Sequence, residues 1–382
     1  MNILVIGNGF DLAHGLPTTY RDFVYFTDRV IAYYEDENKE EFRFAEMFCK
    51  YEKGVRNFCD STSKKGSVEE LISLTEDNCW YNYFREELRE KETYGINEGW
   101  VDFEESISHV IQVMDRMRKC VQSQNILYQS DIRLLDKITK IYKKYIDYTV
   151  TDIKEIKERL LTDLNRLIRG LEIYLVEYVG CIDVLPILPY LKGNVDRVLS
   201  FNYTDTYEKI YGGKKHKKNS IEYDYIHGKV KSNGNIKTCS LVLGIEEYLS
   251  DEEDKRKDNE YIQFKKFYQR IVKKTGCKYI DWIKENEESI SIKTKRKHKN
   301  NVYILGHSLD IKDGDIIARL INMPNTQTTI FYHNQEAFKN QICNLVKILG
   351  EDELIEKVHG ENKSIVFADP KGHPAYRSSS GH

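Results

Sequence analysis

Short apolar runs that end in a glycine or a polar residue recur along the chain. The first covers residues 3–6 and leads into Gly7. A continuous apolar run of this length is typical of a strand buried on both faces of a parallel sheet. Similar runs cover residues 195–201, 223–226, 241–243, 302–305 and 328–332. We predict one α/β sheet whose carboxyl edge carries the polar residues that follow, where open parallel sheets bind their ligands.

The pattern changes to helical periodicity between about residues 31 and 190. Its clearest apolar stripe is Ile153, Ile156, Leu160, Leu164, Leu167 and Leu171. This stripe predicts a long amphipathic helix, with Asp152 as its N-cap and Glu155 as the capping-box partner. Such a stripe is typical of a helix-to-helix core, and it would also suit a partner helix in a homo-oligomer. Near the N-terminus, Thr18 or Thr19 is expected to cap another helix.

These patterns predict an α/β core interrupted by a large all-helical insertion. The core is expected to comprise residues 1–30 and 191–350, the insertion residues 31–190, and a C-terminal tail residues 351–382. The sequence contains neither an apolar stretch of about 20 residues nor a signal-peptide pattern, so we expect a cytoplasmic protein and no membrane partner.

Net charge, basic runs and cysteine spacing indicate which ligands and partners are expected. The net charge of −3 gives no whole-molecule attraction to nucleic acid or to an anionic membrane. The basic runs at residues 214–218 and 293–299 are interpreted as solvated loops, with a nucleic-acid patch as the alternative. The eight cysteines are scattered singly. They are expected to be reduced thiols, and no metal site is expected.

A glycine loop follows the first predicted strand. Gly7 and Gly9 are spaced so that backbone amides from Gly7 to Phe10 could cradle a phosphate. Leu12 occupies the position of the third glycine in the usual dinucleotide motif, and no Gly-Lys-Ser/Thr follows. The alternative is a tight strand exit stabilised by an Asx-type turn at Asp11.

The rest of this stretch resembles the N-terminal signature of the AbiH family, the bacteriophage abortive-infection proteins. It is more distantly similar to the sirtuin motif of Gly-Ala-Gly, Gly-Ile-Pro and an aromatic–Arg pair. The positions that match are Gly7, Gly9, Gly15, Pro17, Tyr20 and Arg21. The AbiH resemblance covers nearly the whole chain, including residues 100–104, whereas the sirtuin-like resemblance covers only the α/β core.

Later segments resemble sirtuin-like motifs in the same order. Residues 200–204 (SFNYT) resemble Thr-x-Asn-x-Asp, although Thr204 stands in place of the aspartate and Asp205 follows it. Residues 226–228 (IHG) resemble the motif of the catalytic histidine. Residues 305–310 (LGHSLD) resemble the Gly-x-Ser segment that holds the adenosine side of the cofactor.

The resemblance implies a Rossmann-like, sirtuin-like core that binds NAD. It implies catalytic roles for Asn202, His227 and Asp11: Asn202 would orient a ribose hydroxyl or water, and His227 would act as the general base. Asp310 would fix His307 or a ribose. The expected cofactor-binding residues are Gly7, Asn8, Gly9, Phe10, Gly15, Pro17, Tyr20, Gly306, His307, Ser308 and Asp310.

Each polar residue also has a structural explanation. Asn202 could satisfy only turn backbone, and His227 could be an ordinary loop histidine. His14, His307 and His333 could also enter the site. The chain lacks the four-cysteine zinc module of sirtuin deacetylases, which favours plain NAD hydrolysis over protein deacylation.

The resemblance therefore implies a phage-defence effector that hydrolyses NAD to ADP-ribose and nicotinamide. The helical insertion would keep it silent or respond to a phage-derived trigger. Two alternatives stay open, namely a non-catalytic sensor of NAD or ADP-ribose and an effector that acts on nucleic acid.

Overall fold

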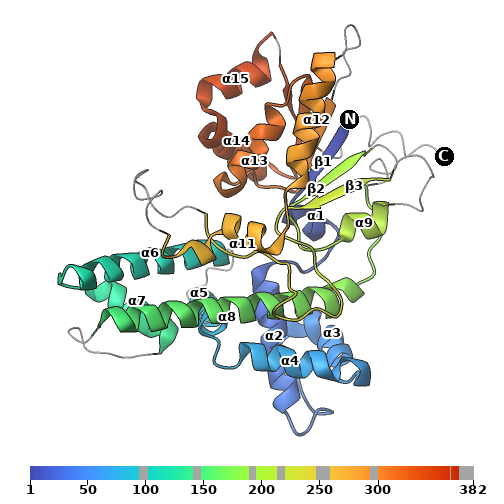
Figure 1. The fold of residues 1–382 in the computed structure, drawn as a ribbon. Helices are drawn as coiled ribbons and strands as arrows, with labels where there is room; N and C mark the ends of the chain where they lie inside the picture. Colours follow the sequence, from blue (N-terminus) through green and yellow to red (C-terminus); the bar gives the residue numbers. More distant parts are fainter. Residues whose placement is uncertain are drawn as a thin grey trace. The chain divides into compact units, whose positions relative to one another are not determined.

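The computed structural model describes residues 1–93, 102–140, 148–188, 195–212, 220–246, 259–292, 300–361 and 363–369. The chain divides into two compact units (Figure 1). The sheet unit comprises Met1–Pro17, Asp183–Lys229 and Lys274–His382, and the helical unit comprises Thr18–Ile182 and Val230–Lys273. Both basic runs, Trp100, Val101 and the end of the chain from residue 370 lie outside the described residues.

The sheet unit is built on six parallel strands in the order β3-β2-β1-β4-β5-β6. The strands are β1 (Asn2–Ile6), β2 (Arg197–Ser200), β3 (Glu222–Tyr225), β4 (Asn300–Leu305), β5 (Thr326–Phe331) and β6 (Ile365–Ala368). β1 is central, with Leu4 opposite Val198 of β2 and Tyr303 of β4. The predicted parallel α/β sheet is therefore confirmed.

Helices cover both faces of this sheet, which explains why β1 is apolar without alternation. On one face, Ile3 and Val5 pack in a core with residues of α12 (Lys278–Ile292), α13 (Gly314–Ile321), α14 (Gln335–Leu349) and α15 (Glu351–His359). On the other face, Leu4 and Ile6 pack with α1 (Asn8–Ala13) and α9 (Thr206–Tyr211).

Two sequence predictions fail around this sheet. Residues 241–243 are buried but form no strand, and they belong to the helical unit. Their backbone is satisfied by side chains, since Gln269 bonds to the N–H and C=O of Leu243, and Lys273 donates to Leu241 O. Conversely, residues 351–368 are not a tail. They form α15 and β6, whose short apolar run pairs with β5.

The units also divide the chain differently from the expected 1–30, 31–190 and 191–350. α2 (Tyr20–Glu35) and residues 230–273 belong to the helical unit. Thr19 caps α2 in a capping box with Asp22, so the second of the two expected threonines is the N-cap. The buried apolar face of α2 packs against α3, α4, α5 and α8, and this packing places it in the helical unit.

The helical unit consists mainly of α-helices. Besides α2, they are α3 (Cys49–Cys59), α4 (Lys65–Thr75), α5 (Cys79–Thr93), α6 (Phe103–Gln122), α7 (Gln129–Thr139), α8 (Val150–Glu177) and α11 (Lys266–Lys273). Short 3-10 turns lie at Glu46–Phe48, Thr62–Lys64, Val179–Cys181 and Ile262–Phe264 here, and at Ile311–Asp313 in the sheet unit. None of the helices in the described ranges is long and apolar enough to cross a membrane.

The predicted amphipathic helix is α8, and its stripe is buried throughout. α8 contacts α4, α5 and α6 of the same unit, so the stripe forms a helix-to-helix core. The cap differs from the prediction. Thr149 is the N-cap and Asp152 is its capping-box partner, because the backbone N–H of each residue donates to the side chain of the other.

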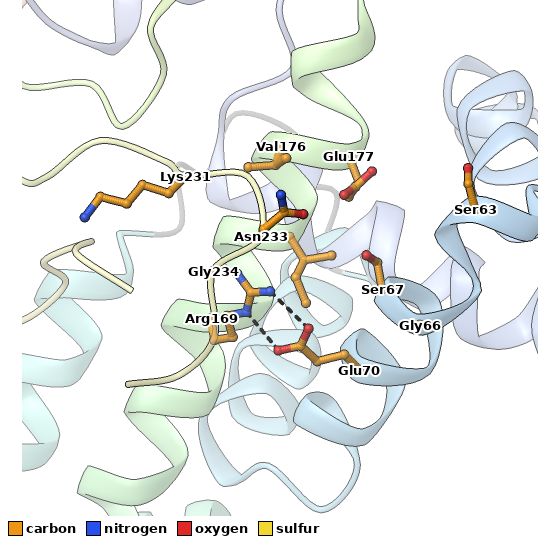
Figure 2. A pocket seen from close by; sticks show the side chains of 11 residues that line it. Ser63, Gly66, Ser67, Glu70, Arg169, Val176, Glu177, Lys231, Asn233 and Gly234 are labelled. Atoms are coloured by element: carbon orange, nitrogen blue, oxygen red, sulfur yellow. Dashed lines mark hydrogen bonds and ion pairs between the residues drawn. The ribbon is translucent and has the colours of Figure 1, made fainter. Parts of the chain in front are cut away.

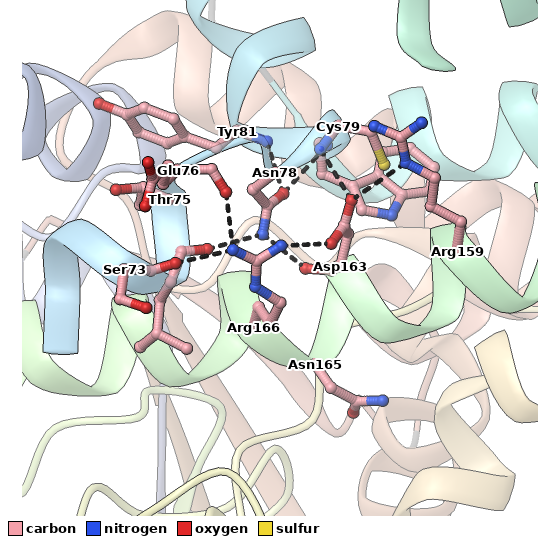
Figure 3. A network of polar contacts seen from close by, with 12 residues as sticks. Ser73, Thr75, Glu76, Asn78, Cys79, Tyr81, Arg159, Asp163, Asn165 and Arg166 are labelled. Carbon is pink, nitrogen blue, oxygen red and sulfur yellow. Dashed lines mark hydrogen bonds and ion pairs between the residues drawn. The ribbon is translucent and has the colours of Figure 1, made fainter. Parts of the chain in front are cut away.

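A buried polar network fastens the turn between α4 and α5 to the middle of α8 (Figure 3). Asp163 accepts hydrogen bonds from the backbone N–H of Cys79 at 3.0 Å and from Arg166 Nη1 at 2.8 Å. Arg166 Nη2 in turn donates to the carbonyls of Ser73 and Glu76, at 2.7 Å each. Asn78 caps α5 and donates to the carbonyl of Asp163. The network satisfies buried backbone groups that would otherwise weaken the turn.

Candidate functional site

Polar residues gather at the carboxyl edge of the sheet where the strand order reverses. Asn202 follows β2, His227 follows β3, and His307 follows β4. Asp11 lies in α1 directly after β1, and Asp313 precedes α13. β1 has β2 on one side and β4 on the other, so chain segments leave this edge in both directions. This is the place where open parallel sheets bind ligands.

The glycine loop is packed against the exit of β4. A Cβ on Gly7 or Gly9 would lie 2.8 Å from the carbonyl oxygen of Gly306, so the close approach of the two loops requires glycine. The amides of Gly7 and Gly9 donate to Leu305 O and Gly306 O, and the amide of Phe10 donates to Gly7 O. These three amides are therefore used within the protein. The predicted phosphate cradle does not describe their role.

Asp11 is 1% exposed and lies inside α1, so it forms no Asx-type turn at a strand exit. Burial raises the pKa of its carboxyl to about 6, although the side chains of Thr204, Thr206 and Asn202 oppose this shift. Thr204 donates to Oδ2 of Asp11, and Thr206 donates to Thr204 at 3.0 Å. Oδ1 has no hydrogen-bond partner within the described part of the chain.

The Thr204 hydroxyl, from the loop after β2, holds the carboxyl of Asp11 in α1. Thr204 and Thr206 were not among the predicted site residues. The signal that could have found them is the run of hydroxyl residues next to Asn202 in the β2 loop.

Asn202 is 5% exposed, and its side chain is not used by the turn. Ser200 Oγ satisfies the turn instead, because it accepts from Asn202 N at 3.1 Å and donates to Asn202 O at 3.2 Å. Both amide atoms of Asn202, Oδ1 and Nδ2, are buried and make no hydrogen bond of regular geometry among the residues that the structure describes, although the side chain lies close enough to the Asp11 carboxyl to lower its pKa. The interpretation of Asn202 as a residue that only satisfies turn backbone is therefore wrong.

His227 and His307 face one carboxylate. His227 Nε2 lies 3.5 Å from Asp313 Oδ1, and His307 Nε2 lies 3.5 Å from Asp313 Oδ2. Both rings are buried, and the ring of Phe201 is edge-on to each of them, at centroid distances of 5.7 Å and 4.4 Å. Asp313 was not predicted. It is one of many acidic residues in the sequence, and only the fold brings it to the histidines.

Helix α14 holds the β4 exit in place. Gln341 Nε2 donates to the carbonyl of His307 at 3.1 Å, and Asn344 Nδ2 donates to the carbonyl of Ser308 at 3.0 Å. Asp310 caps the following turn by accepting from Lys312 N at 2.9 Å. The carboxylate that faces His307 Nε2 is that of Asp313.

Other predicted residues have structural roles. Gly15 adopts a φ of 76°, which favours glycine. His14 bonds to Phe10 O and to the hydroxyl of Tyr211 at 2.7 Å each. Tyr20 belongs to the helical unit with its ring stacked on Phe103 at 4.3 Å.

Three further predicted residues are placed by the fold as follows. Pro17 is the last residue of the first segment of the sheet unit, and Asn8 begins α1. His333, after β5, is exposed. Within the described ranges, no group of three or more His, Cys, Asp or Glu side chains is arranged to hold a metal ion.

We expect Asp11→Asn to stabilise the protein at neutral pH. The raised pKa means that the folded state binds the Asp11 proton more tightly than the unfolded chain, so stability from this group is complete below pH 3.8 and is lost as pH rises through about 6. The cost of ionising Asp11 above that range is on the order of 3 kcal/mol.

Urea unfolding at several pH values tests this expectation. Asp11→Asn should be the more stable protein at pH 7 by about 1–3 kcal/mol, and the difference should shrink towards pH 4. Asp315→Asn, at an exposed position of α13, is the control and should show no such trend. A constant difference at all pH values would contradict the expectation.

The helical unit contains a separate cavity of about 390 Å³ between α4, α8 and residues 231–234 (Figure 2). Arg169 lines it, but its guanidinium is fully engaged by Glu70, at 2.8 and 3.0 Å, and by Glu172, at 2.7 Å. The carboxylates therefore neutralise this cation.

Comparisons with known proteins identify the family. No curated protein and no solved structure matches the chain. A family model described as "Bacteriophage abortive infection AbiH" matches residues 3–333, which include the glycine loop, the helical unit and the strands β1 to β5. This match covers most of the chain and suggests a role in phage abortive infection. The chain belongs to the AbiH family of bacteriophage abortive infection proteins.

Proposed function

We propose that this protein is a phage-defence effector that binds NAD at the carboxyl edge of its sheet and hydrolyses it to ADP-ribose and nicotinamide. The observation that carries the proposal is Asn202, whose two buried amide atoms make no hydrogen bond of regular geometry within the described residues. Buried polar groups without partners are uncommon, and a bound ligand with both donors and acceptors would satisfy them. Ribose hydroxyl groups have this property.

The surroundings of Asn202 support a nucleotide as the ligand. The strand order β3-β2-β1-β4-β5-β6 is that of the sheets that bind dinucleotides at the switch point. The unpartnered Oδ1 of Asp11 adds an acceptor on the same edge. The glycine loop supports the proposal less than its sequence suggests, because its amides from Gly7, Gly9 and Phe10 bond within the protein.

The proposed reaction needs few groups. The bond between the anomeric carbon of the ribose and the nicotinamide nitrogen breaks, its electron pair leaves with nicotinamide, and water adds to the anomeric carbon. His227 takes the proton that the water releases. Asn202 orients the water or a ribose hydroxyl. Loss of NAD in the cytoplasm would stop growth of an infected cell, which fits the family's role in abortive infection.

Chromatography of NAD and nicotinamide tests the proposal on the purified full chain. Asn202→Ala and His227→Ala should each lower turnover at least about a hundredfold, an effect of the size seen when a positioned catalytic group is removed. His333→Ala, at an exposed position after β5, is the matched histidine control and should retain wild-type turnover. Circular dichroism should show each variant to be folded.

Calorimetric titration with NAD separates the alternatives. NAD binding without turnover, even after addition of extract from phage-infected cells, would favour a sensor over a hydrolase. If the protein shows no NAD binding and no turnover in the presence of that extract, the proposal is ruled out. In that case, salt-dependent binding of DNA or RNA would support the nucleic-acid alternative.

A further inference from the structure

The tautomer of neutral His307 is determined by a hydrogen bond from the backbone of its own loop. Leu309 N–H donates to Nδ1 of His307 at 2.9 Å. An amide nitrogen can only donate, so Nδ1 must carry the lone pair, and the proton of the neutral ring must lie on Nε2. Leu309 adopts a φ of 59° and is fully buried in the core next to α13, which holds its N–H in this direction.

The carboxylate of Asp313, which both histidines face, also determines the tautomer of His227. His307 Nε2 faces Asp313 Oδ2, and a carboxylate accepts at both oxygens. The other oxygen, Oδ1, faces His227 Nε2. A neutral His227 therefore carries its proton on Nε2, and its lone pair lies on Nδ1.

We propose that Asp313 is a positioning residue that sets the tautomer of His227, so that Nδ1 is the nitrogen that accepts a proton. This inference rests on the proposed function in its catalytic part, where His227 is the general base. In this scheme Leu309 N–H donates to His307 Nδ1, and the Nε2–H groups of His307 and His227 each point at one oxygen of Asp313, at 3.5 Å. Asp313 does not touch the substrate in this scheme. It orients the ring that does.

Replacing Asp313 by asparagine has an asymmetric consequence. The amide offers one acceptor and one donor in place of two acceptors. His307 cannot change its tautomer, because Leu309 N–H still requires a lone pair on Nδ1. The asparagine amide is therefore oriented with its oxygen, Oδ1, towards the Nε2–H of His307. His227 faces the NH2 group, and its proton moves to Nδ1, so the base loses its lone pair at the working nitrogen.

Nitrogen NMR of the full chain labelled with ¹⁵N-histidine tests this scheme at alkaline pH, where imidazole side chains are neutral. The two neutral tautomers differ in the shifts of Nδ1 and Nε2, and signals of His227 are assigned by their loss in His227→Gln. We expect the Nε2–H form at His227 and His307 in the wild type. In Asp313→Asn, only His227 should change to the Nδ1–H form.

Kinetics provide the second readout. Asp313→Asn should lower kcat on the order of a hundredfold with KM for NAD nearly unchanged, because the ring stays in place and only its tautomer changes. Asp315→Asn, on the exposed side of α13, is the matched control and should leave both the tautomers and kcat at wild-type values.

The outcomes separate the two proposals. A wild-type His227 in the Nδ1–H form overturns the inference even if Asp313→Asn fails to fold. An Asp313→Asn protein in which His227 keeps the Nε2–H form overturns it as well. The expected tautomers and their change, in a protein that does not hydrolyse NAD, would support the positioning role of Asp313 while contradicting NAD hydrolysis.

Discussion

Gly306→Ala is expected to lower the free energy of unfolding of the sheet unit by about 3–5 kcal/mol. Gly306 has a φ of 67°, where an L-residue is strained, and a Cβ there would lie 2.2 Å from Phe10 N and 2.6 Å from Gly9 C. The contacting atoms are backbone, so they cannot rotate away. The methyl group would separate β4 from the glycine loop.

Hydrogen exchange of peptides from β1 and β4 measures this loss where it arises. Gly350→Ala is the matched control, because Gly350 also has a positive φ, of 86°, but nothing lies within 4 Å of the added Cβ. It should cost about 1–3 kcal/mol, which is the strain of the backbone conformation alone. Equal losses at both positions would show that the contact between the loops contributes little.

Asp163→Ala is expected to destabilise the helical unit by about 3–5 kcal/mol. The substitution removes the acceptor of the Cys79 N–H and the ion-pair partner of Arg166 (Figure 3). A buried donor and a partly buried cation would then be left without their acceptor, which costs more than the net value of the bonds themselves.

Thermal and urea unfolding should show the loss, and hydrogen exchange should rise in α5 and α8 before other helices. Asn165→Ala is the control two residues away. Its side chain bonds only to its own helix at an exposed position, and we expect a change within about 0.5 kcal/mol. If Asp163→Ala changed the free energy of unfolding as little as Asn165→Ala, then Arg166 and Asn78 would suffice to hold the turn between α4 and α5.

The sheet could be predicted from the sequence where burial alone dictates strands. Residues 3–6 have no polar position, and such a run is stable only between two covered faces. The same criterion failed at residues 241–243, because side chains of Gln269 and Lys273 satisfy that backbone and no local pattern encodes them. β6 was missed because a short apolar run near a chain end resembles a tail.

The site was predictable only at strand ends. Asn202, His227 and His307 follow apolar runs, so their meeting at one edge follows from parallel strands. Asp11 was also predicted, but not its bond to Thr204. Asp313 depends on a turn after β4 and on the register between strands, and neither can be predicted from residue types. The glycine loop resembled a phosphate site because a close contact between two backbones requires the same residues.

The order of segments in the sheet has a consequence during synthesis. β1 is the central strand, but its neighbours β2 and β4 begin at Arg197 and Asn300. At about 5–20 residues per second, the apolar residues of β1 wait roughly 10–40 s on the ribosome before β2 is made, and longer for β4. Most of the helical unit is encoded between β1 and β2, so it can fold before β2 is made. The nascent chain should therefore depend on chaperones that shield its first residues, and the sheet would remain incomplete until most of the chain has been made.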